Sequence, residues 1–366
     1  CELPRIQLGP GELTDAAISP DQSFLVACVR DDDLHNRNQL LLIRNHAAID
    51  RVNLPDSADG IGLSPDGLCV VVAGEKYAAI DIFAVVDPRA GLPLRLELAA
   101  RIGWEDFAPF FVGEEARLVA DDLEPESVSF NPSGSLAFVS LQEQSSVAVI
   151  DMATLRLVNV VHLPHGFLVD LSDAGDGSVF GTFGVNPDAM SVTPDGNFLI
   201  IANEADREAP HLQGISIVDL RNGPVAIPSP VTFCVFDLDP TLLNGTDLTA
   251  CPIIPPGQEP TPAETAAIRA LPRLDPNNTE SVGRQRKTVT AVNIERKPKD
   301  QDRGTVLFLD CSDLVNGGFP LAINRVLVGM NKNARPEGLK SSNMGRFIWV
   351  GLQNDGGTIA RIELAD

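Results

Sequence analysis

The stretch Glu126-Ser-Val-Ser-Phe-Asn-Pro-Ser-Gly134 decides the fold, because close variants of it recur along the chain. Each copy has a carboxylate near its start, continues as a short apolar strand and ends in a turn. Pro presets φ at the first corner of the turn, Asp or Ser bonds back to the backbone, and Gly takes the positive φ that follows. The other copies are residues 59–67, 188–196 and, more weakly, 14–22. An apolar run of strand type follows every copy, so one hairpin recurs along the chain.

The hairpin belongs to a larger unit of four predicted strands. In the cleanest unit these strands are residues 127–130, 136–141, 146–151 and 157–163. A period of about 40–50 residues with four strands per unit is typical of a β-propeller. We therefore predict an all-β fold, a single β-propeller that is six-bladed by repeat count, with a seventh blade possible in residues 237–284.

The two ends of the chain indicate how the ring closes. The last unit lacks a fourth strand, whereas residues 2–9 offer a spare strand with nothing before it to pair with. Pairing residues 5–8 beside residues 359–364 would close the ring and remove two open sheet edges. We predict one domain over residues 1–366, with this N-terminal strand closing the last blade. Residues 237–284 are rich in Pro, Asn and Thr, and we interpret them as a surface insertion.

The charge of the chain narrows the classes of partner. Fifty acidic residues against 28 basic ones give a formal net charge of −22. Such a field repels nucleic acid and attracts cations, so we predict no nucleic-acid partner. No apolar run approaches the roughly 20 residues that a membrane helix needs, so we predict no transmembrane segment.

Six cysteines at wide spacing indicate an oxidising compartment, and none of them forms a Cys-x-x-Cys pair. Cys234 and Cys251 bracket one polar loop, and we predict a disulfide between them. The pairing of the other four stays open, and these could also remain buried thiols: Cys1, Cys28, Cys69 and Cys311. Cys1 could alternatively carry a lipid.

Four carboxylates hold one position in their units, six residues before the turn Pro or its equivalent: Asp59, Glu126, Asp188 and Glu337. These acids come just before the predicted innermost strands, which line the central channel of a propeller, so their side chains would ring one mouth of it. Converging carboxylates suit Ca²⁺, which takes six to eight oxygen ligands. The alternative is that each acid bonds backbone N–H groups at a blade junction or is simply solvated.

A second group of acids lies in a Gly-containing loop, at Asp170, Asp173 and Asp176. This spacing can wrap Ca²⁺, although it departs from the Asp-x-Asp-x-Asp-Gly order of an EF-hand. A solvated loop is the alternative. The sequence has no Gly-x-Ser-x-Gly elbow, Walker loop or Rossmann fingerprint, so we assign no catalytic residue and no organic cofactor.

Three stretches together resemble the "choice-of-anchor I" proteins, which are secreted or surface-anchored bacterial propellers. Residues 123–151 resemble the most recognisable blade of that family. Asn186-Pro-Asp-Ala-Met190, followed by Ala202-Asn-Glu-Ala-Asp206, resembles the next blade, except that Ala205 replaces a Gly. Arg335-Pro-Glu-Gly-Leu339 with residues 350–353 and 356–357 resembles a late blade, and residues 170–177 sit where the family has an Asp-rich loop. The resemblance implies an extracellular propeller and little about chemistry.

Two functions follow from these observations. The first is a secreted or cell-surface structural and binding module, stabilised by Ca²⁺ and disulfides, which binds a protein or cell-envelope partner or assembles with itself. The alternative is a Ca²⁺-dependent hydrolase of esterase, lactonase or phytase type with its site at the central channel. An open pocket over the four channel acids, with a base nearby, would favour the enzyme. We favour the module and leave enzymatic activity open.

Overall fold

The computed structural model describes thirteen segments of the chain, namely residues 12–30, 38–45, 47–87, 93–111, 123–163, 186–203, 214–227, 289–294, 304–310, 321–328, 336–341, 347–352 and 358–363. Side chains are described up to residue 226. Within these segments the chain forms 22 β-strands, one short α-helix and one 3-10 helix.

The first half of the chain forms three sheets of four strands each. Their strands are β1 (Glu12–Ile18), β2 (Leu25–Arg30), β3 (Gln39–Arg44), β4 (Ala47–Asn53), β5 (Gly60–Leu63), β6 (Cys69–Gly74), β7 (Ala79–Val86), β8 (Arg95–Ile102), β9 (Pro125–Phe130), β10 (Leu136–Leu141), β11 (Ser146–Asp151) and β12 (Arg156–His162). Within each sheet the strands follow chain order and pair antiparallel with their neighbours.

The second half continues the pattern with one four-stranded and two three-stranded sheets. Their strands are β13 (Pro187–Val192), β14 (Phe198–Asn203), β15 (Gly214–Asp219), β16 (Val225–Ile227), β17 (Val289–Ile294), β18 (Gly304–Asp310), β19 (Leu321–Val328), β20 (Pro336–Ser341), β21 (Phe347–Leu352) and β22 (Thr358–Glu363). We number the six described sheets as blades one to six in chain order.

The predicted turns join the first and second strands of their blades. The N–H of Gly134 donates to the carbonyl of Asn131 at 2.9 Å, and φ at Gly134 is +71°. A Cβ at Gly134 would lie 3.1 Å from Cδ of Pro65, in the turn of the preceding blade. Gly67 and Gly196 repeat this arrangement against the Pro residues of the blades before them. The turn motif therefore fixes the hairpin and also packs each blade against the previous one.

The hydrophobic core lies between consecutive blades. On β10, Val139 packs with Val71 of the second blade, whereas the adjacent Phe138 packs with Leu199 of the fourth. Successive strand residues point to opposite faces, so a strand covered on both faces is apolar throughout. Phe107, in the helix α1 (Trp104–Phe107) that precedes η1 (Ala108–Phe110), completes the core between blades two and three. This packing explains the uninterrupted apolar runs of the second strands.

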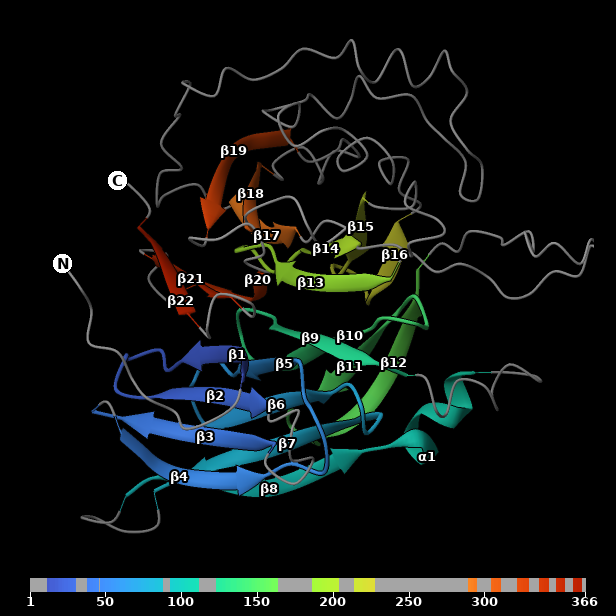
Figure 1. Ribbon diagram of the computed structural model, residues 1–366. Helices are drawn as coiled ribbons and strands as arrows, with labels where there is room; N and C mark the ends of the chain where they lie inside the picture. Colours follow the sequence, from blue (N-terminus) through green and yellow to red (C-terminus); the bar gives the residue numbers. More distant parts are fainter. Residues whose placement is uncertain are drawn as a thin grey trace, which may run out of the picture.

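The first strands of the blades gather toward the centre of the molecule, and β4, β8 and β12 lie at its periphery (Figure 1). Each first strand contacts the next in the order β1, β5, β9, β13, β17 and β20, and β20 contacts β1. The all-β, propeller-like architecture predicted from the repeats is therefore confirmed. The spare strand at residues 2–9 and the insertion at residues 237–284 lie outside the described residues. The six-blade count, ring closure and single domain stay predictions.

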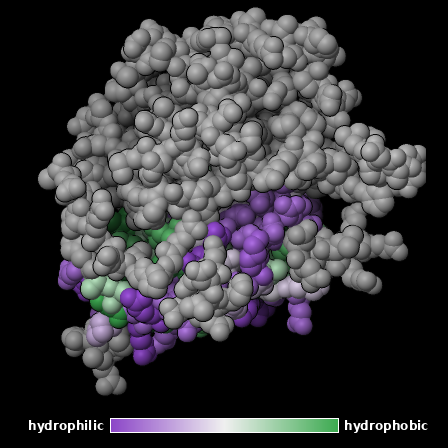
Figure 2. Space-filling view, viewed as in Figure 1, coloured by the Kyte–Doolittle hydropathy of each residue, from purple (hydrophilic) through white to green (hydrophobic). Residues whose placement is uncertain are grey.

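The surface seen in Figure 2 is mostly hydrophilic where the structure describes it, with smaller hydrophobic patches between. The large apolar side chains exposed among the described residues are scattered over three blades, at Leu68, Leu98, Val158 and Val225. Isolated residues of this kind are normal on a protein surface. No helix within the described segments has the length and apolar character needed to cross a membrane.

Candidate metal site

Three carboxylates from two neighbouring blades meet at one end of the first strands. Asp59 directly precedes β5, Glu75 directly follows β6, and Glu126 is the second residue of β9. Because β5 and β6 pair antiparallel, with Gly60 opposite Ala73, the start of one strand and the end of the other lie together. Strand β9 contacts both of them. The fold thus brings Glu126 of the third blade to the paired ends of the second.

Gly60 allows this close approach between the two blades. A Cβ at this position would lie 1.8 Å from the carbonyl oxygen of Glu126, a separation that no real side chain tolerates. A glycine is therefore required where the backbone of β5 passes the backbone of β9. The contact places Asp59, the residue before Gly60, beside Glu126.

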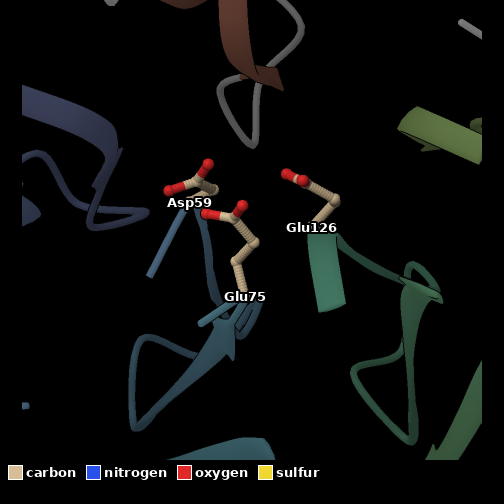
Figure 3. Close-up of side chains that lie close together, drawn as sticks. All are labelled: Asp59, Glu75 and Glu126. Atoms are coloured by element: carbon tan, nitrogen blue, oxygen red, sulfur yellow. The ribbon is translucent and has the colours of Figure 1, made fainter. Parts of the chain in front are cut away.

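The three side chains turn their carboxylates toward one another (Figure 3). One oxygen of each carboxylate lies within 4.8 Å of those of the other two. The side chains of Asp59 and Glu75 are only 11% and 10% exposed. This arrangement concentrates negative charge in a place that water reaches poorly, which is costly unless a cation balances it.

Two basic residues lie at the edge of the cluster. Nη1 of Arg30 is 3.8 Å from Oδ1 of Asp59. Nζ of Lys76 contacts Glu75 and lies 3.6 Å from Oε1 of Glu124. With Glu126, the group therefore holds four carboxylates and two cationic side chains. Lys76 is half-exposed, so its ion pairs are weakened by solvent.

The electrostatics of the cluster appear in the titration of Asp59. Burial, followed by the negative charge of Glu75, raises the pKa of Asp59 to about 7, against the weaker opposing influence of Arg30 and Lys76. Desolvation and a neighbouring like charge both disfavour the ionised carboxylate. Near neutral pH this position therefore favours a bound proton or a nearby cation.

The structure brings together two of the four predicted channel acids, Asp59 and Glu126. Asp188 lies on β13, buried, and is not part of the three-carboxylate group. Between β9 and β13 the hydroxyl of Ser140 accepts the N–H of Ser127 at 2.8 Å and donates to the carbonyl of Asp188 at 3.1 Å. The hydroxyl of Ser140 therefore links β9 to β13, whereas β5 and β9 come into direct backbone contact at Gly60.

The other predicted site residues fall where the structure gives no side-chain description. Glu337 is the second residue of β20, so it lies within a first strand and not before it as predicted, and its side chain is not described. The Asp-rich loop and the predicted disulfide lie outside the described residues, so these stay predictions for Asp170, Asp173, Asp176, Cys234 and Cys251. Cys28 and Cys69, whose pairing was open, are free thiols.

Glu75 is the site residue that sequence reasoning missed. The motif drew attention to residues before the turn, whereas Glu75 follows the turn Gly67 by eight positions. Gln142 stands eight residues after Gly134, and Arg30 eight residues after Gln22. The end of the second strand is thus polar in all three units, and antiparallel pairing places it at the same end of the sheet as the start of the first strand. The pairing of these two strand ends in the predicted hairpin was the feature of the sequence from which Glu75 could have been identified.

Asp15 shows the structural role that was the alternative for these acids. Its Oδ2 accepts the N–H of Ile61 at 2.8 Å, and its Oδ1 accepts the N–H of Ala16 at 2.7 Å. A buried carboxylate of the first blade thereby caps the first strand of the second. The neighbouring Thr14 hydroxyl donates to the carbonyl of Ala58 at 2.6 Å and reinforces the same junction.

Comparison with known proteins supports the family resemblance. The choice-of-anchor I domain model matches residues 107–183, about a fifth of the chain, which include the whole of the third blade. The resemblance that residues 123–151 predicted is therefore confirmed over this part of the chain. No curated protein matches the sequence.

Two solved structures resemble the chain over most of its length at low sequence identity. Hydrazine synthase of Kuenenia stuttgartiensis aligns with a TM-score of 0.46 and 13% identity, over 97% of this chain and 96% of that one. A functionally unknown protein of Desulfotomaculum acetoxidans aligns with a TM-score of 0.45 and 14% identity, over 96% and 90%. Neither similarity bears on the chemistry of this chain.

Proposed function

We propose that this chain is a secreted or cell-surface β-propeller that serves as a structural and binding module. The match of residues 107–183 to the choice-of-anchor I domain carries the proposal. The matched residues include a complete four-stranded blade, β9 to β12, and flanking blades of the same design pack on both of its faces. The name of the domain refers to anchoring, which fits a protein displayed outside the cell.

The proposed module is a closed ring of six blades. Contacts from each first strand to the next, including that from β20 to β1, support a closed ring. The N-terminal strand at residues 2–9 would complete the last blade, and residues 237–284 would project as a surface insertion of the same domain. Closure removes open sheet edges and makes a rigid platform on which loops and strand ends can bind a partner.

The proposed partner is a protein or a component of the cell envelope, or a second copy of the chain. A net charge of −22 favours partners with cationic groups and disfavours nucleic acid. The alternative of a Ca²⁺-dependent hydrolase would use the same mouth of the channel. On the described residues, no observation favours the hydrolase over the binding module.

Surface labelling of intact cells tests this function. Cells that produce the protein are treated with a membrane-impermeant biotin reagent, and a cytosolic protein serves as the control. We expect the chain to be labelled in intact cells or recovered from the medium, with the control unlabelled. Labelling of the chain only after lysis would overturn the proposal. Sedimentation of the purified chain with the envelope fraction then identifies whether the partner lies there.

A further inference from the structure

We propose that Asp59, Glu75 and Glu126 form a Ca²⁺ site that bridges the second and third blades. The site rests on the proposed function and deepens it, because it names the ligand that the mouth of the propeller takes. It differs from the site expected from the sequence, since it includes Glu75 and leaves out Asp188.

Buried carboxylate oxygens without partners point to a missing ligand. Within the described part of the chain, Oδ1 of Asp59 and Oε2 of Glu75 are buried and accept no hydrogen bond. The side chain of Glu75 is nine-tenths buried and is directed into the cluster (Figure 3). Buried polar atoms in native proteins are nearly always satisfied, so two oxygens without a partner in one cluster require an explanation. A cation between the three carboxylates satisfies both.

The ion pairs already present leave this requirement unmet. Arg30 approaches Oδ1 of Asp59 only to 3.8 Å, beyond hydrogen-bond distance. Lys76 contacts the other oxygen of Glu75, Oε1, from a half-exposed position at the edge of the cluster. Neither ion pair therefore supplies a hydrogen-bond partner to Oε2 of Glu75 or Oδ1 of Asp59.

The dimensions and chemistry of the cluster favour Ca²⁺. Calcium binds oxygens at about 2.3–2.6 Å, so ligands on opposite sides of the ion lie about 4.6–5.2 Å apart. One oxygen of each carboxylate lies within 4.8 Å of those of the other two, so small side-chain adjustments would bring all three to one such ion. Mg²⁺ needs shorter distances and near-ideal octahedral geometry, and Zn²⁺ prefers ligand sets that contain His or Cys. Three carboxylates leave positions for water in the flexible shell of Ca²⁺.

The position of the site gives the ion a mechanical role. Asp59 and Glu75 belong to the second blade and Glu126 to the third, so a shared ion crosslinks two blades at the channel end of their interface. An ion that binds only the folded protein stabilises it by mass action. Bound Ca²⁺ should therefore stabilise the packing of these two blades, because it connects strands that lie far apart along the chain.

Calorimetric titration of the full-length protein with CaCl₂, after removal of metal with EDTA, tests the site. We expect the wild type to bind about one Ca²⁺ per protein molecule at this site. Glu75→Gln and Glu126→Gln should each bind Ca²⁺ at least roughly tenfold more weakly, since loss of even an outer partner of a metal ligand costs about 10–100-fold in affinity. Glu97→Gln is the matched control, because Glu97 is an exposed residue of the second blade paired only at the surface. Equal affinity of all four proteins would overturn the site.

Thermal unfolding shows that weaker binding is not the result of misfolding. In EDTA, Glu75→Gln should melt at the same temperature as the wild type or higher, because it removes a negative charge beside Asp59. In CaCl₂ the order should reverse, with the wild type the more stable. A Glu75→Gln protein that is less stable by the same margin in both conditions would contradict the proposal.

Titration with MgCl₂ tests the choice of ion. We expect Mg²⁺ to bind at least about tenfold more weakly than Ca²⁺ at this site. Equal affinity for the two ions would overturn the assignment of calcium. Surface labelling of intact cells is independent of these titrations, so a protein that is labelled but binds no Ca²⁺ would overturn the site and leave the proposed function standing.

Discussion

Replacing Gly60 by Ala tests whether the contact between β5 and β9 builds both the blade interface and the carboxylate cluster. The new Cβ would lie 1.8 Å from the carbonyl oxygen of Glu126, whereas real Cβ contacts are essentially never shorter than 3.0 Å. The two strands must therefore separate by at least 1.2 Å, the difference between these two distances. The nearest atoms are all backbone atoms of Glu126 and Ser127, so no side-chain rotation can relieve the overlap.

The expected loss of stability follows from this geometry. Overpacking a well-packed interior typically costs about 1–3 kcal/mol, and an overlap with fixed backbone belongs at or above the top of that range. We expect Gly60→Ala to lower the free energy of unfolding by about 3 kcal/mol or more. The displacement also separates Asp59 from Glu126, so Ca²⁺ affinity should fall at least roughly tenfold, as for loss of a ligand.

Urea unfolding followed by tryptophan fluorescence measures the first effect, since Trp104 packs against the core between the second and third blades. Gly103→Ala is the control, because a Cβ at Gly103 would meet nothing within 4 Å and should change the midpoint little. If Gly60→Ala unfolds at the same urea concentration as the wild type, the close approach of the two strands is wrong.

The remaining predictions concern the turns, the ion pair of a buried carboxylate, and pH. Gly134→Ala should destabilise the protein by about 1–2 kcal/mol, because Ala is strained at φ +71° and its Cβ would press on Pro65. In urea unfolding, the same substitution should cost less when it is combined with Pro65→Ala. Identical losses in both backgrounds would refute the contact between Gly134 and Pro65. Arg101 binds the buried carboxylate of Asp81 through two contacts of 2.6 and 2.8 Å. Arg101→Met should cost about 2 kcal/mol or more in the same assay, because it removes the cationic partner of that carboxylate and leaves it the hydrogen bond from the Tyr77 hydroxyl; an unchanged midpoint would contradict this role. In metal-free protein, Asp59 should make stability fall as pH rises from about 4 to 7, since its pKa is raised from 3.8 to about 7 and the folded state therefore keeps a proton that the unfolded chain has released. Asp59→Asn should flatten this part of the pH profile measured by thermal unfolding, and a wild-type slope in the variant would rule out Asp59 as its source.

The repeated architecture could be predicted from the sequence because its cause is local. Pro, Asp and Gly in the turn determine a hairpin within nine residues, as in residues 126–134, and the hairpin recurs visibly. The first strands begin slightly earlier than predicted, at Pro125 and Pro187, because Pro is tolerated as the first residue of a strand. Glu126 and Asp188 consequently lie within these strands and not before them.

The membership of the site could be predicted only in part, because it depends on contacts between blades. Equivalent positions in the repeat predicted one ring of carboxylates, yet the junctions differ in detail. Gly60 lets β5 and β9 touch, whereas Ser127 occupies the same position in the next blade and joins a network through the hydroxyl of Ser140. The absence of a side chain at Gly60 thus determines which acids converge. The repeat pattern treats Gly60 and Ser127 as equivalent, so it does not predict this difference.

A crystal structure of the protein grown with CaCl₂, with anomalous data to identify the ion, tests this site most directly. We predict one Ca²⁺ bound by carboxylate oxygens of Asp59, Glu75 and Glu126 at about 2.3–2.6 Å, with water completing its shell. A cluster that holds no ion at saturating calcium, or an ion bound elsewhere on the channel mouth while these three carboxylates remain without it, would contradict the proposal.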